Sequence, residues 1–531
     1  MVEPVSRVRG FVDVAVSAVA GAALWASFPE LSWWWASIPA LAVFFSRVDT
    51  ASAPRALVNA GAFGAAFWLP LISWAPLATG GGWLPWAALA GSQIVFLLGW
   101  ALVARLVRVW RWTRGPVGQA LVYAVTWTGV EELRSSTPWT GFPWGSVALP
   151  QVDSPLGHVA PYGGHVGVAM MTVAIAVLVR RAFSLSRFQD VVRWWGRPLL
   201  LAGAVVLFVA PAALVLPNGQ EAGALRVGVV QGDVPLPGPA AFAREGEVAS
   251  LNAAMTDEIA RAGEGVDLVI WGETGADRDP RESALVEGIV SVSADRVGAP
   301  MLIGFANERG AQRWNWLGVW YPGSGLDESS LYAKQRPVPF GEFIPFRSVV
   351  SALATEAAQV GMDMAAGSAP GYMEARVSGS RTVPMAVGIC FESAYADLIA
   401  EGVRLGGQVI VTPSNNYHFR RSSESAQQGQ LLRMRAMEYS RSAIQASTTG
   451  RSYVIRPDGS VQAVTEAQAA DALVATVPLR TSVTWAAVLD PWPSRVVVWA
   501  TGVFVLMSAG AGLALRRGGD SDRDSTGYTG E

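Results

Sequence analysis

Three apolar runs of the sequence end in polar residues that could take part in catalysis. The runs and the residues that follow them are Val266–Trp271 with Glu273, Val383–Ile389 with Cys390, and Val409–Thr412 with Asn415 and Asn416. A fourth segment carries Lys334, in a chain with hardly any lysine, and Glu342. In open α/β sheets, sites form beyond the carboxyl ends of strands, so we expect these side chains to meet there.

Cys390 is the only cysteine of the chain, and a thiol becomes a strong nucleophile once it is deprotonated. Most cysteine enzymes use histidine as the base, and His418 is the only histidine nearby in sequence. Glu273 could instead take the thiol proton. Lys334 could lower the pKa of the thiol and stabilise an oxyanion, with the backbone N–H of Phe391 as a second donor.

Each of these residues also has a structural interpretation. A single cysteine is commonly a small buried apolar residue, and a glutamate with a lysine commonly forms a structural ion pair. Glu342 could cap a turn beside Pro345, and Glu392 could be a surface acid. The apolar residues around Glu342 could form ordinary core or a mobile lid that meets acyl chains; they are Phe340, Phe343, Ile344, Met362 and Met364.

The first and last parts of the chain have the composition of a membrane protein. Charged residues make up 15% of the 531 residues, whereas soluble proteins have about 25%. Apolar runs of roughly 17–25 residues can cross a bilayer. We predict eight such spans, with cores at 11–28, 31–46, 56–75, 84–104, 117–133, 164–180, 198–216 and 496–515.

Arginine is concentrated in every second loop between these spans. By the positive-inside rule, both termini are then cytoplasmic and residues 221–485 lie outside the cell. Residues 221–485 alternate short apolar runs with helical stretches, which predicts an α/β layered domain. The predicted division is therefore a seven-span part at 1–220, a catalytic domain at 221–485, and an eighth span with a cytoplasmic tail at 486–531.

The predicted strands of residues 221–485 are Arg226–Val230, Val266–Trp271, Met301–Phe305, Trp316–Tyr321, Val383–Ile389, Val409–Thr412 and Ser452–Ile455. The predicted helices are Ala241–Ala262, Glu282–Arg296 and Ser425–Ser442. The net charge of −2 argues against a nucleic-acid partner. His158, His165 and His418 lack the spacing of metal ligands, so we predict no metal and no cofactor.

The order Glu273, Lys334, Cys390, with these flanking sequences, resembles the nitrilase (carbon–nitrogen hydrolase) superfamily. Within it the chain is similar to the apolipoprotein N-acyltransferase family. The supporting segments are TGFPWGSVALPQVDSPLGHVAPYGG, VGVVQGDVP and QLLRMRAMEYSRSAIQASTTGRSYVIRPDG. Four features depart from the family's pattern. Gly272 replaces a proline before the glutamate, Phe391 replaces a tyrosine, the loop at 415–419 reads Asn-Asn-Tyr-His-Phe, and a tryptophan after the Gln-Gly start is missing from PLPGPAAF.

The resemblance implies an αββα sandwich on a polytopic membrane bundle in the bacterial plasma membrane. It implies transfer of an acyl chain from a phospholipid to the α-amino group of a diacylglyceryl-cysteine at a lipoprotein N-terminus. The acyl chain would travel as a thioester of Cys390, with Glu273 and Lys334 completing a triad. Glu342, Phe391 and Glu392 would support the triad, and we expect a monomer. The expected substrate contacts are Phe340, Phe343, Met362, Asn415 and Asn416.

Two other classes of function compete with this interpretation. A membrane-anchored amidase of the nitrilase type would hydrolyse a small amide, but an anchor needs one span, not eight. A transporter or an inactive structural protein would carry ionisable residues along a substrate path. Glu131 and Glu132 are the only candidates for such residues in the predicted spans.

Overall fold

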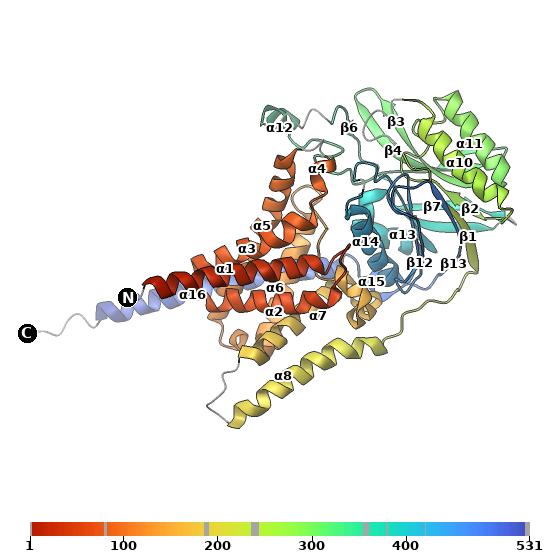
Figure 1. The fold of residues 1–531 in the computed structure, drawn as a ribbon. Coiled ribbons are helices and arrows are strands. Elements are labelled where there is room, and N and C mark those ends of the chain that lie inside the picture. Colours follow the sequence, from red (N-terminus) through yellow and green to blue (C-terminus); the bar gives the residue numbers. More distant parts are fainter. Residues whose placement is uncertain are drawn as a thin grey trace, which may run out of the picture.

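The computed structural model describes residues 3–78, 82–184, 191–234, 244–353, 360–378, 381–419 and 421–525. Figure 1 shows a bundle of long helices that lies beside a part built from sheets and helices. The bundle is made by both ends of the chain, because α16 (Trp492–Ser525) lies along the N-terminal helices and packs on α6 (Pro116–Ser136).

A helix occupies each of the eight predicted spans. Besides α6 and α16, they are α1 (Glu3–Ala26), α2 (Ser37–Thr50), α3 (Ala53–Leu71), α5 (Trp83–Leu106), α7 (Ala160–Ser184) and α8 (Val191–Val209). In the described residues, four segments are long and apolar enough to cross a membrane: Trp83–Val109, Pro155–Ser184, Gly196–Ala213 and Trp492–Ala514. Two of the others differ for clear reasons. The 14 residues of α2 extend only about 21 Å, and the end of α6 carries Glu131, Glu132 and Arg134.

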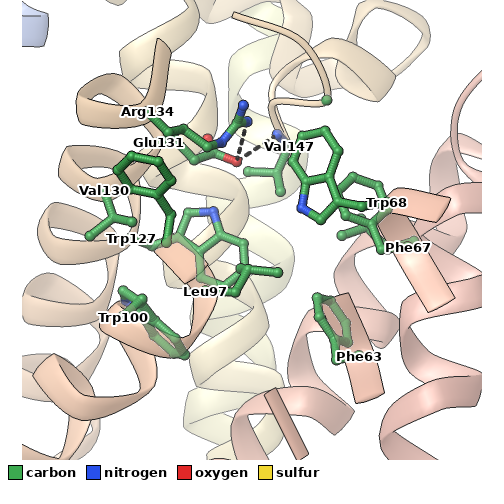
Figure 2. A pocket seen from close by; sticks show the side chains of 13 residues that line it. Phe63, Phe67, Trp68, Leu97, Trp100, Trp127, Val130, Glu131, Arg134 and Val147 are labelled. Atoms are coloured by element: carbon green, nitrogen blue, oxygen red, sulfur yellow. Dashed lines mark hydrogen bonds and ion pairs between the residues drawn. The ribbon is translucent and has the colours of Figure 1, made fainter. Parts of the chain in front are cut away.

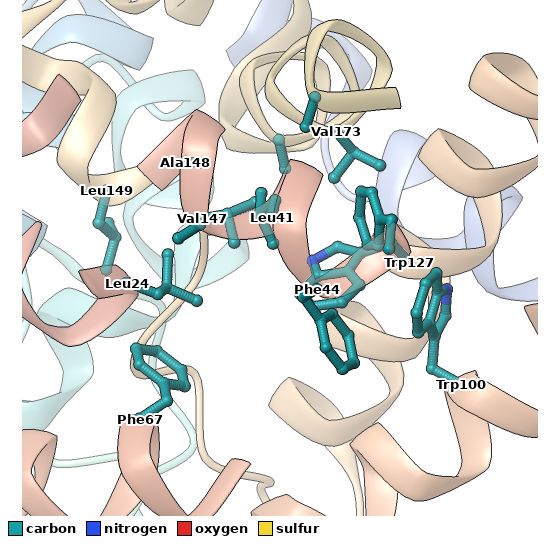
Figure 3. Close-up of a cluster of buried hydrophobic side chains, with 14 of the residues drawn as sticks. Leu24, Leu41, Phe44, Phe67, Trp100, Trp127, Val147, Ala148, Leu149 and Val173 are labelled. Atoms are coloured by element: carbon teal, nitrogen blue, oxygen red, sulfur yellow. The ribbon is translucent and has the colours of Figure 1, made fainter. Parts of the chain in front are cut away.

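Aromatic side chains fill the centre of the bundle. The rings of Phe44 and Phe63 stack with centroids 4.0 Å apart, and Trp100 meets Trp127 edge to face at 4.9 Å. Figure 3 shows side chains of this core converging from several helices. The same buried cluster includes Met437 of α14 (Glu424–Tyr439), a helix that belongs to the α/β part. The two parts therefore share one continuous apolar core.

Two sheets form the α/β part. The first has the order β13-β1-β2-β3-β4-β5, with β6 paired to β4, and the second has the order β12-β11-β10-β9-β8-β7. The strands of the first are β1 (Ala224–Gln231), β2 (Leu268–Ile270), β3 (Met301–Arg309), β4 (Gln312–Tyr321), β5 (Gly325–Ala333), β6 (Asp363–Met364) and β13 (Asp471–Pro478). Those of the second are β7 (Tyr372–Arg376), β8 (Thr382–Val387), β9 (Val409–Ser414), β10 (Ala443–Ser447), β11 (Tyr453–Ile455) and β12 (Val461–Val464).

The sheets pack face to face and helices cover their outer faces. Val229 and Ile270 of the first sheet share a buried cluster with Val387 and Val411 of the second. The helices α10 (Glu247–Arg261) and α11 (Ala284–Val297) pack on the first sheet, and α13 (Ala396–Arg404) and α14 pack on the second. The layers thus follow the order helix, sheet, sheet, helix that the resemblance implies.

All seven predicted strands are present, but the sequence analysis missed β5, β6, β7, β10, β12 and β13. Several of these are rich in polar or small residues: β10 reads Ala-Ile-Gln-Ala-Ser, which strand propensities disfavour. The predicted helix Ala241–Ala262 begins at Glu247 instead, after Gly246 in a left-handed conformation (φ 79°); residues 241–243 lie outside the described part. The predicted helix Glu282–Arg296 corresponds to α11, and Ser425–Ser442 corresponds to α14.

Candidate active site

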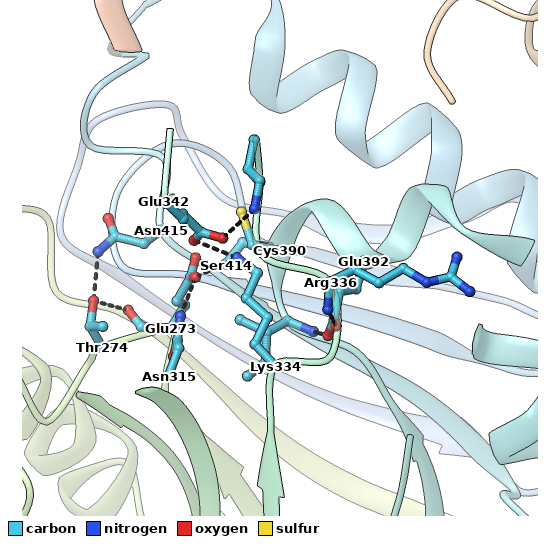
Figure 4. A network of polar contacts seen from close by, with 12 residues as sticks. Glu273, Thr274, Asn315, Lys334, Arg336, Glu342, Cys390, Glu392, Ser414 and Asn415 are labelled. Carbon is cyan, nitrogen blue, oxygen red and sulfur yellow. Dashed lines mark hydrogen bonds and ion pairs between the residues drawn. The ribbon is translucent and has the colours of Figure 1, made fainter. Parts of the chain in front are cut away.

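The ends of four strands bring the predicted catalytic residues together. Glu273 follows β2, Lys334 follows β5, Cys390 follows β8 and Asn415 follows β9. Because β8 and β9 are parallel neighbours, their carboxyl ends lie at the same edge of the sheet. Figure 4 shows the four side chains converging there.

Lys334, the only lysine of the chain, bridges two glutamates. Its Nζ donates to Glu273 Oε1 at 3.2 Å and to Glu342 Oε1 at 2.6 Å. Asn315 Nδ2 donates to the same oxygen of Glu273 at 2.6 Å. Only 1% of Lys334 is exposed. A buried ammonium is costly unless it is paired, so the two carboxyl groups fix its position.

Burial and neighbouring charges set the protonation of the cluster. Burial raises the pKa of Glu273, which the Lys334 ammonium lowers in part and the Glu342 carboxylate raises further. Burial would lower the pKa of Lys334, but the charges of Glu273, Glu342 and Cys390 hold it well above its usual value. Burial, with the Glu273 charge, also raises the pKa of Cys390 well above its usual range, although Lys334 opposes this effect. The resting cluster therefore pairs a neutral thiol with an ammonium, and the thiol needs a base during the reaction.

The backbone and a glutamine aim the thiol. Cys390 has a φ of 54°, a left-handed conformation that costs a residue with a side chain about 1–3 kcal/mol. It opens the short helix η9 (Cys390–Ala394), whose first N–H groups have no partner inside the helix. Gln428 Nε2 donates to Cys390 Sγ at 3.7 Å, and Asn416 Nδ2 donates to Gln428 Oε1 at 2.9 Å. The phenyl ring of Phe391 stacks on Trp144, 5.6 Å between centroids.

Glu392 is fully buried, so its interpretation as a surface acid is wrong. Its carboxylate accepts four hydrogen bonds of 2.7–2.9 Å, from the hydroxyl of Tyr332 and the backbone N–H groups of Gln335, Arg336 and Ile389. These bonds tie the segment after Lys334 to the residue before Cys390. Glu392 thus fixes the positions of Lys334 and Cys390 relative to each other.

The departure at Gly272 has a steric reason. A Cβ atom there would lie 2.5 Å from the backbone nitrogen of Thr448 and 2.9 Å from the carbonyl oxygen of Ser414. The backbone N–H of Glu273 donates to the same carbonyl oxygen of Ser414 at 3.2 Å. Asn415 Nδ2 donates to Thr274 Oγ1 at 2.7 Å and closes the loop from the other side. The close approach of these backbones therefore places the Glu273 carboxyl.

The residues predicted for the lid differ in burial. Phe340 is 41% exposed, and its ring meets that of Trp139 at 5.3 Å. Phe343 and Met362 are half-buried, whereas Ile344 is buried against Val360. Met364 lies in β6 and is half-buried.

His418 packs against its neighbour Tyr417. Its ring lies 3.7 Å from the ring of Tyr417, and within the described residues it has no hydrogen bond or ion pair with Cys390. Burial lowers its pKa to about 4. Sequence analysis missed Asn315, Glu424 and Gln428, which the fold places around the predicted residues.

Comparisons with known proteins identify the family of this chain. Residues 20–178 match the family described as apolipoprotein N-acyltransferase N-terminal domain, and residues 226–487 match carbon-nitrogen hydrolase. The chain is 31% identical to an apolipoprotein N-acyltransferase of Mycolicibacterium smegmatis over 92% of its own length and 84% of the relative. This chain belongs to the apolipoprotein N-acyltransferase family.

A second apolipoprotein N-acyltransferase agrees with this assignment. An apolipoprotein N-acyltransferase of Ralstonia nicotianae is 29% identical over 87% of this chain and 86% of the relative. The crystal structure of an amidase from Nesterenkonia sp. aligns with 54% of this chain and 98% of its own, at 16% identity and a TM-score of 0.37. As an apolipoprotein N-acyltransferase, the chain is a membrane acyltransferase of lipoprotein maturation, which uses a lipid donor and a lipoprotein acceptor.

Proposed function

We propose that the family reaction runs in this chain through a thioester on Cys390, with Glu273 as the base and Lys334 as the oxyanion donor. The observation that carries this proposal is the buried bridge from Lys334 to Glu273 and Glu342 beside the only cysteine. Because Glu342 and Asn315 also bind this bridge, the Glu273 carboxyl is held in one place. Such preorganised charges stabilise a developing oxyanion with little rearrangement.

Two half-reactions transfer the acyl chain. In the first, Glu273 takes the thiol proton while sulfur attacks the ester carbonyl of a phospholipid. Lys334 and the backbone N–H of Phe391 hold the oxyanion, and Glu273 returns the proton to the leaving alkoxide, which departs as a lysophospholipid. In the second, the lipoprotein amine attacks the thioester, the C–S bond breaks, and the thiol of Cys390 is restored. Asn415 and Asn416 flank the bound substrate.

A small cavity lies in the helical bundle, between α1, α3, α5 and α6. Its volume is about 20 Å³, and most of its lining side chains are apolar. Figure 2 shows Glu131 and Arg134 at its polar end. The Arg134 guanidinium donates to the carbonyls of Phe142 and Trp144, at 2.9 and 2.7 Å. A cavity of this size has room for about one water molecule, so the proposal of a phospholipid donor rests on the family and not on this cavity.

The segment with Phe340, Phe343 and Met362 is proposed as a lid for acyl chains. Its exposed Phe340 and Phe346 both contact the ring of Trp139, from the loop after α6. Replacing Phe343 with Asp would force a charge against lipid at a cost of several kcal/mol. Unchanged lipid turnover in Phe343→Asp would refute the lid.

The arginine pattern supports an eight-span topology, with both termini in the cytoplasm of a bacterium and the catalytic domain (residues 221–485) outside the plasma membrane. The proposed division at 220 falls between the two matched regions, 20–178 and 226–487, and the division at 485 falls two residues before the end of the second region, ahead of α16. Reporter fusions after Leu216 and at the C-terminus should report opposite sides of the membrane. Both reporters on one side would refute the topology.

Labelled phospholipid tests the triad when no acceptor is present. We expect the full-length protein to acquire label on Cys390, and Cys390→Ala to acquire none. Cys390→Ser should be almost inactive, since a hydroxyl is much harder to ionise than a thiol of pKa about 8.5. Glu273→Gln and Lys334→Ala should each load label at least about 10²-fold more slowly.

Three results would contradict the mechanism. They are label that stays on Cys390→Ala, loading of Glu273→Gln at the wild-type rate, and loading of Lys334→Ala at that rate. Release of the label to water in preference to a diacylglyceryl-peptide amine would favour the amidase alternative.

A further inference from the structure

A third carboxyl group, that of Glu424, lies beside the triad, and one of its oxygens has no hydrogen-bond partner among the described residues. It is the first residue of α14 and only 3% exposed. Its Oε2 is buried and, in the described part of the chain, accepts no hydrogen bond. By contrast, Glu273 and Glu342 are both engaged by Lys334. A buried carboxyl oxygen with no partner is costly, which suggests that a group absent from the free protein completes it.

The fold places Glu424 on the side of α14 that faces the thiol. Gln428, one helical turn further, donates to Cys390 Sγ at 3.7 Å, and residues four apart share a helix face. The helix α14 packs on η9, which begins with Cys390. The charge of Glu424 acts on both Cys390 and Glu273.

The same end of α14 also touches the helical bundle. Gln427 Oε1 accepts from the indole N–H groups of Trp74 and Trp144, at 3.1 and 2.7 Å, and its Nε2 donates to the carbonyl of Leu71 at 3.0 Å. Glu424 therefore lies on the wall of the site nearest the membrane helices. An acceptor that is anchored in the bilayer by its diacylglyceryl group would bring its α-amino group to this wall.

We propose that Glu424 is a further catalytic residue, which binds the α-ammonium group of the acceptor and takes a proton from it before the amine attacks the Cys390 thioester. The inference rests on the proposed thioester and assigns a residue to its second half-reaction. Glu273 and Lys334 then serve the acyl group, and Glu424 serves the amine.

The acidity of Glu424 suits this role. Burial, and then the charge of Glu273, raises the pKa of Glu424 to about 8. An α-amino group has a pKa of about 7.7–8.0. Proton transfer between groups of nearly equal pKa is close to neutral in free energy, which is where general acid–base catalysis is most effective.

The proton balance of the second half-reaction then closes. The ammonium gives one proton to the Glu424 carboxylate and becomes a neutral amine, whose nitrogen bonds to the thioester carbon. The nitrogen gives its second proton to Glu273 as the C–S bond breaks, and Glu273 passes that proton to the departing thiolate. The products are the amide, the thiol of Cys390 and protonated Glu424, which loses its proton to solvent.

The two half-reactions can be measured separately in Glu424→Gln. We expect the full-length variant to load labelled phospholipid at the wild-type rate. Transfer of the label to a diacylglyceryl-cysteinyl peptide with a free α-amino group should be slower by about 10²-fold, as for the loss of an acid–base group. Glu424→Asp keeps a carboxyl group and should recover part of the transfer rate.

A second nucleophile separates catalysis from structure. Hydroxylamine is largely uncharged at neutral pH and needs no base, so it should cleave the thioester of Glu424→Gln at the wild-type rate. Glu247→Gln, which removes an acidic residue from the first turn of α10, is the matched control and should change neither half-reaction.

Wild-type transfer to the peptide by Glu424→Gln, or equal slowing with the peptide and hydroxylamine, would overturn the role of Glu424. So would a loss of loading, or Glu424→Asp no faster than Glu424→Gln. A wild-type protein that never acquires label would overturn the thioester itself, and with it this inference.

Discussion

Two buried clusters of charged residues are built on opposite plans. The catalytic cluster comprises Glu273, Lys334, Glu342, Cys390 and Glu424. The interface cluster comprises Glu132, His165, Arg435 and Glu438, and a further acid, Asp490, lies beside it. In the catalytic cluster Lys334 is the one cation beside three carboxyl groups and a thiol, and it forms ion pairs with Glu273 and Glu342. In the interface cluster the two glutamates lie opposite an arginine and a histidine.

The interface cluster joins the helical bundle to α14. His165 of α7 bonds through Nδ1 to Glu438 Oε1 at 2.8 Å and through Nε2 to Glu132 Oε1 at 3.2 Å. Arg435 Nη2 lies 2.9 Å from Glu438 Oε2. Gly164, with a φ of 63°, lets the backbone N–H of His165 reach Glu438 Oε1 at 2.5 Å.

The balance of charges decides whether a cluster serves stability or proton transfer. A matched set of buried charges resists change, because removing one partner leaves another unpaired. A set with more carboxyl groups than cations keeps some of them protonated near neutral pH, which is the condition for proton transfer. The interface cluster should therefore fail by unfolding, and the catalytic cluster by losing rate.

The largest effect is expected from Arg435→Met. This change leaves Glu438 without its arginine in a fully buried place, which should lower the free energy of unfolding by about 3–5 kcal/mol. Denaturant unfolding in detergent micelles would measure it. The double variant Arg435→Met/Glu438→Gln should lose less than the sum of the single changes; strict additivity would show that the two charges are not coupled.

A smaller effect, on rate, is expected from Gly272→Ala. The added Cβ would meet the Thr448 nitrogen at 2.5 Å, so Glu273 must move. A displacement of about 1 Å can cost about 10²-fold in rate, and we expect such a loss in loading of Cys390. Gly288→Ala is the control, because its Cβ meets nothing within 4 Å in α11. Full activity of Gly272→Ala would mean that Glu273 does not depend on this contact.

The smallest effect concerns pH and Asp490. Burial, with Asp397 and Glu438, raises the pKa of Asp490 to about 7, although His165 and Arg435 oppose this. An unfolded aspartate has a pKa of about 3.9, so the protonated side chain stabilises the fold fully below about pH 4, and this contribution is lost as pH rises through about 7.

Asp490→Asn removes this titration. The fall in unfolding free energy between about pH 5 and about pH 8 should therefore be smaller in the variant, by about 2 kcal/mol. Denaturant unfolding of both proteins at the two pH values would measure the difference. An equal pH dependence would exclude Asp490 as its source.

The sequence predicted the polar ends of β2, β8 and β9 because apolar strands followed by glutamate, cysteine or asparagine are local patterns. The sequence analysis missed the residues whose burial and roles depend on tertiary contacts. The sequence of α14 is polar enough for a surface helix, yet every residue except Arg433 is buried between the second sheet and the bundle. The roles of Gln428 and Glu424 depend on that burial, which no periodicity reveals. The surface alternative for Glu392 stayed open for the same reason, since its four donors come from separate segments.

The shared core determines how the protein can be produced in the laboratory. Leu431, Met434 and Met437 of α14 belong to the same buried cluster as the membrane helices, and Gln427 completes its hydrogen bonds on them. A truncated form that starts near residue 221 would expose these side chains to water as an apolar patch that favours aggregation. Soluble expression of the hydrolase-like half should therefore yield aggregates, and inhibitor screening needs the intact chain in detergent or nanodiscs.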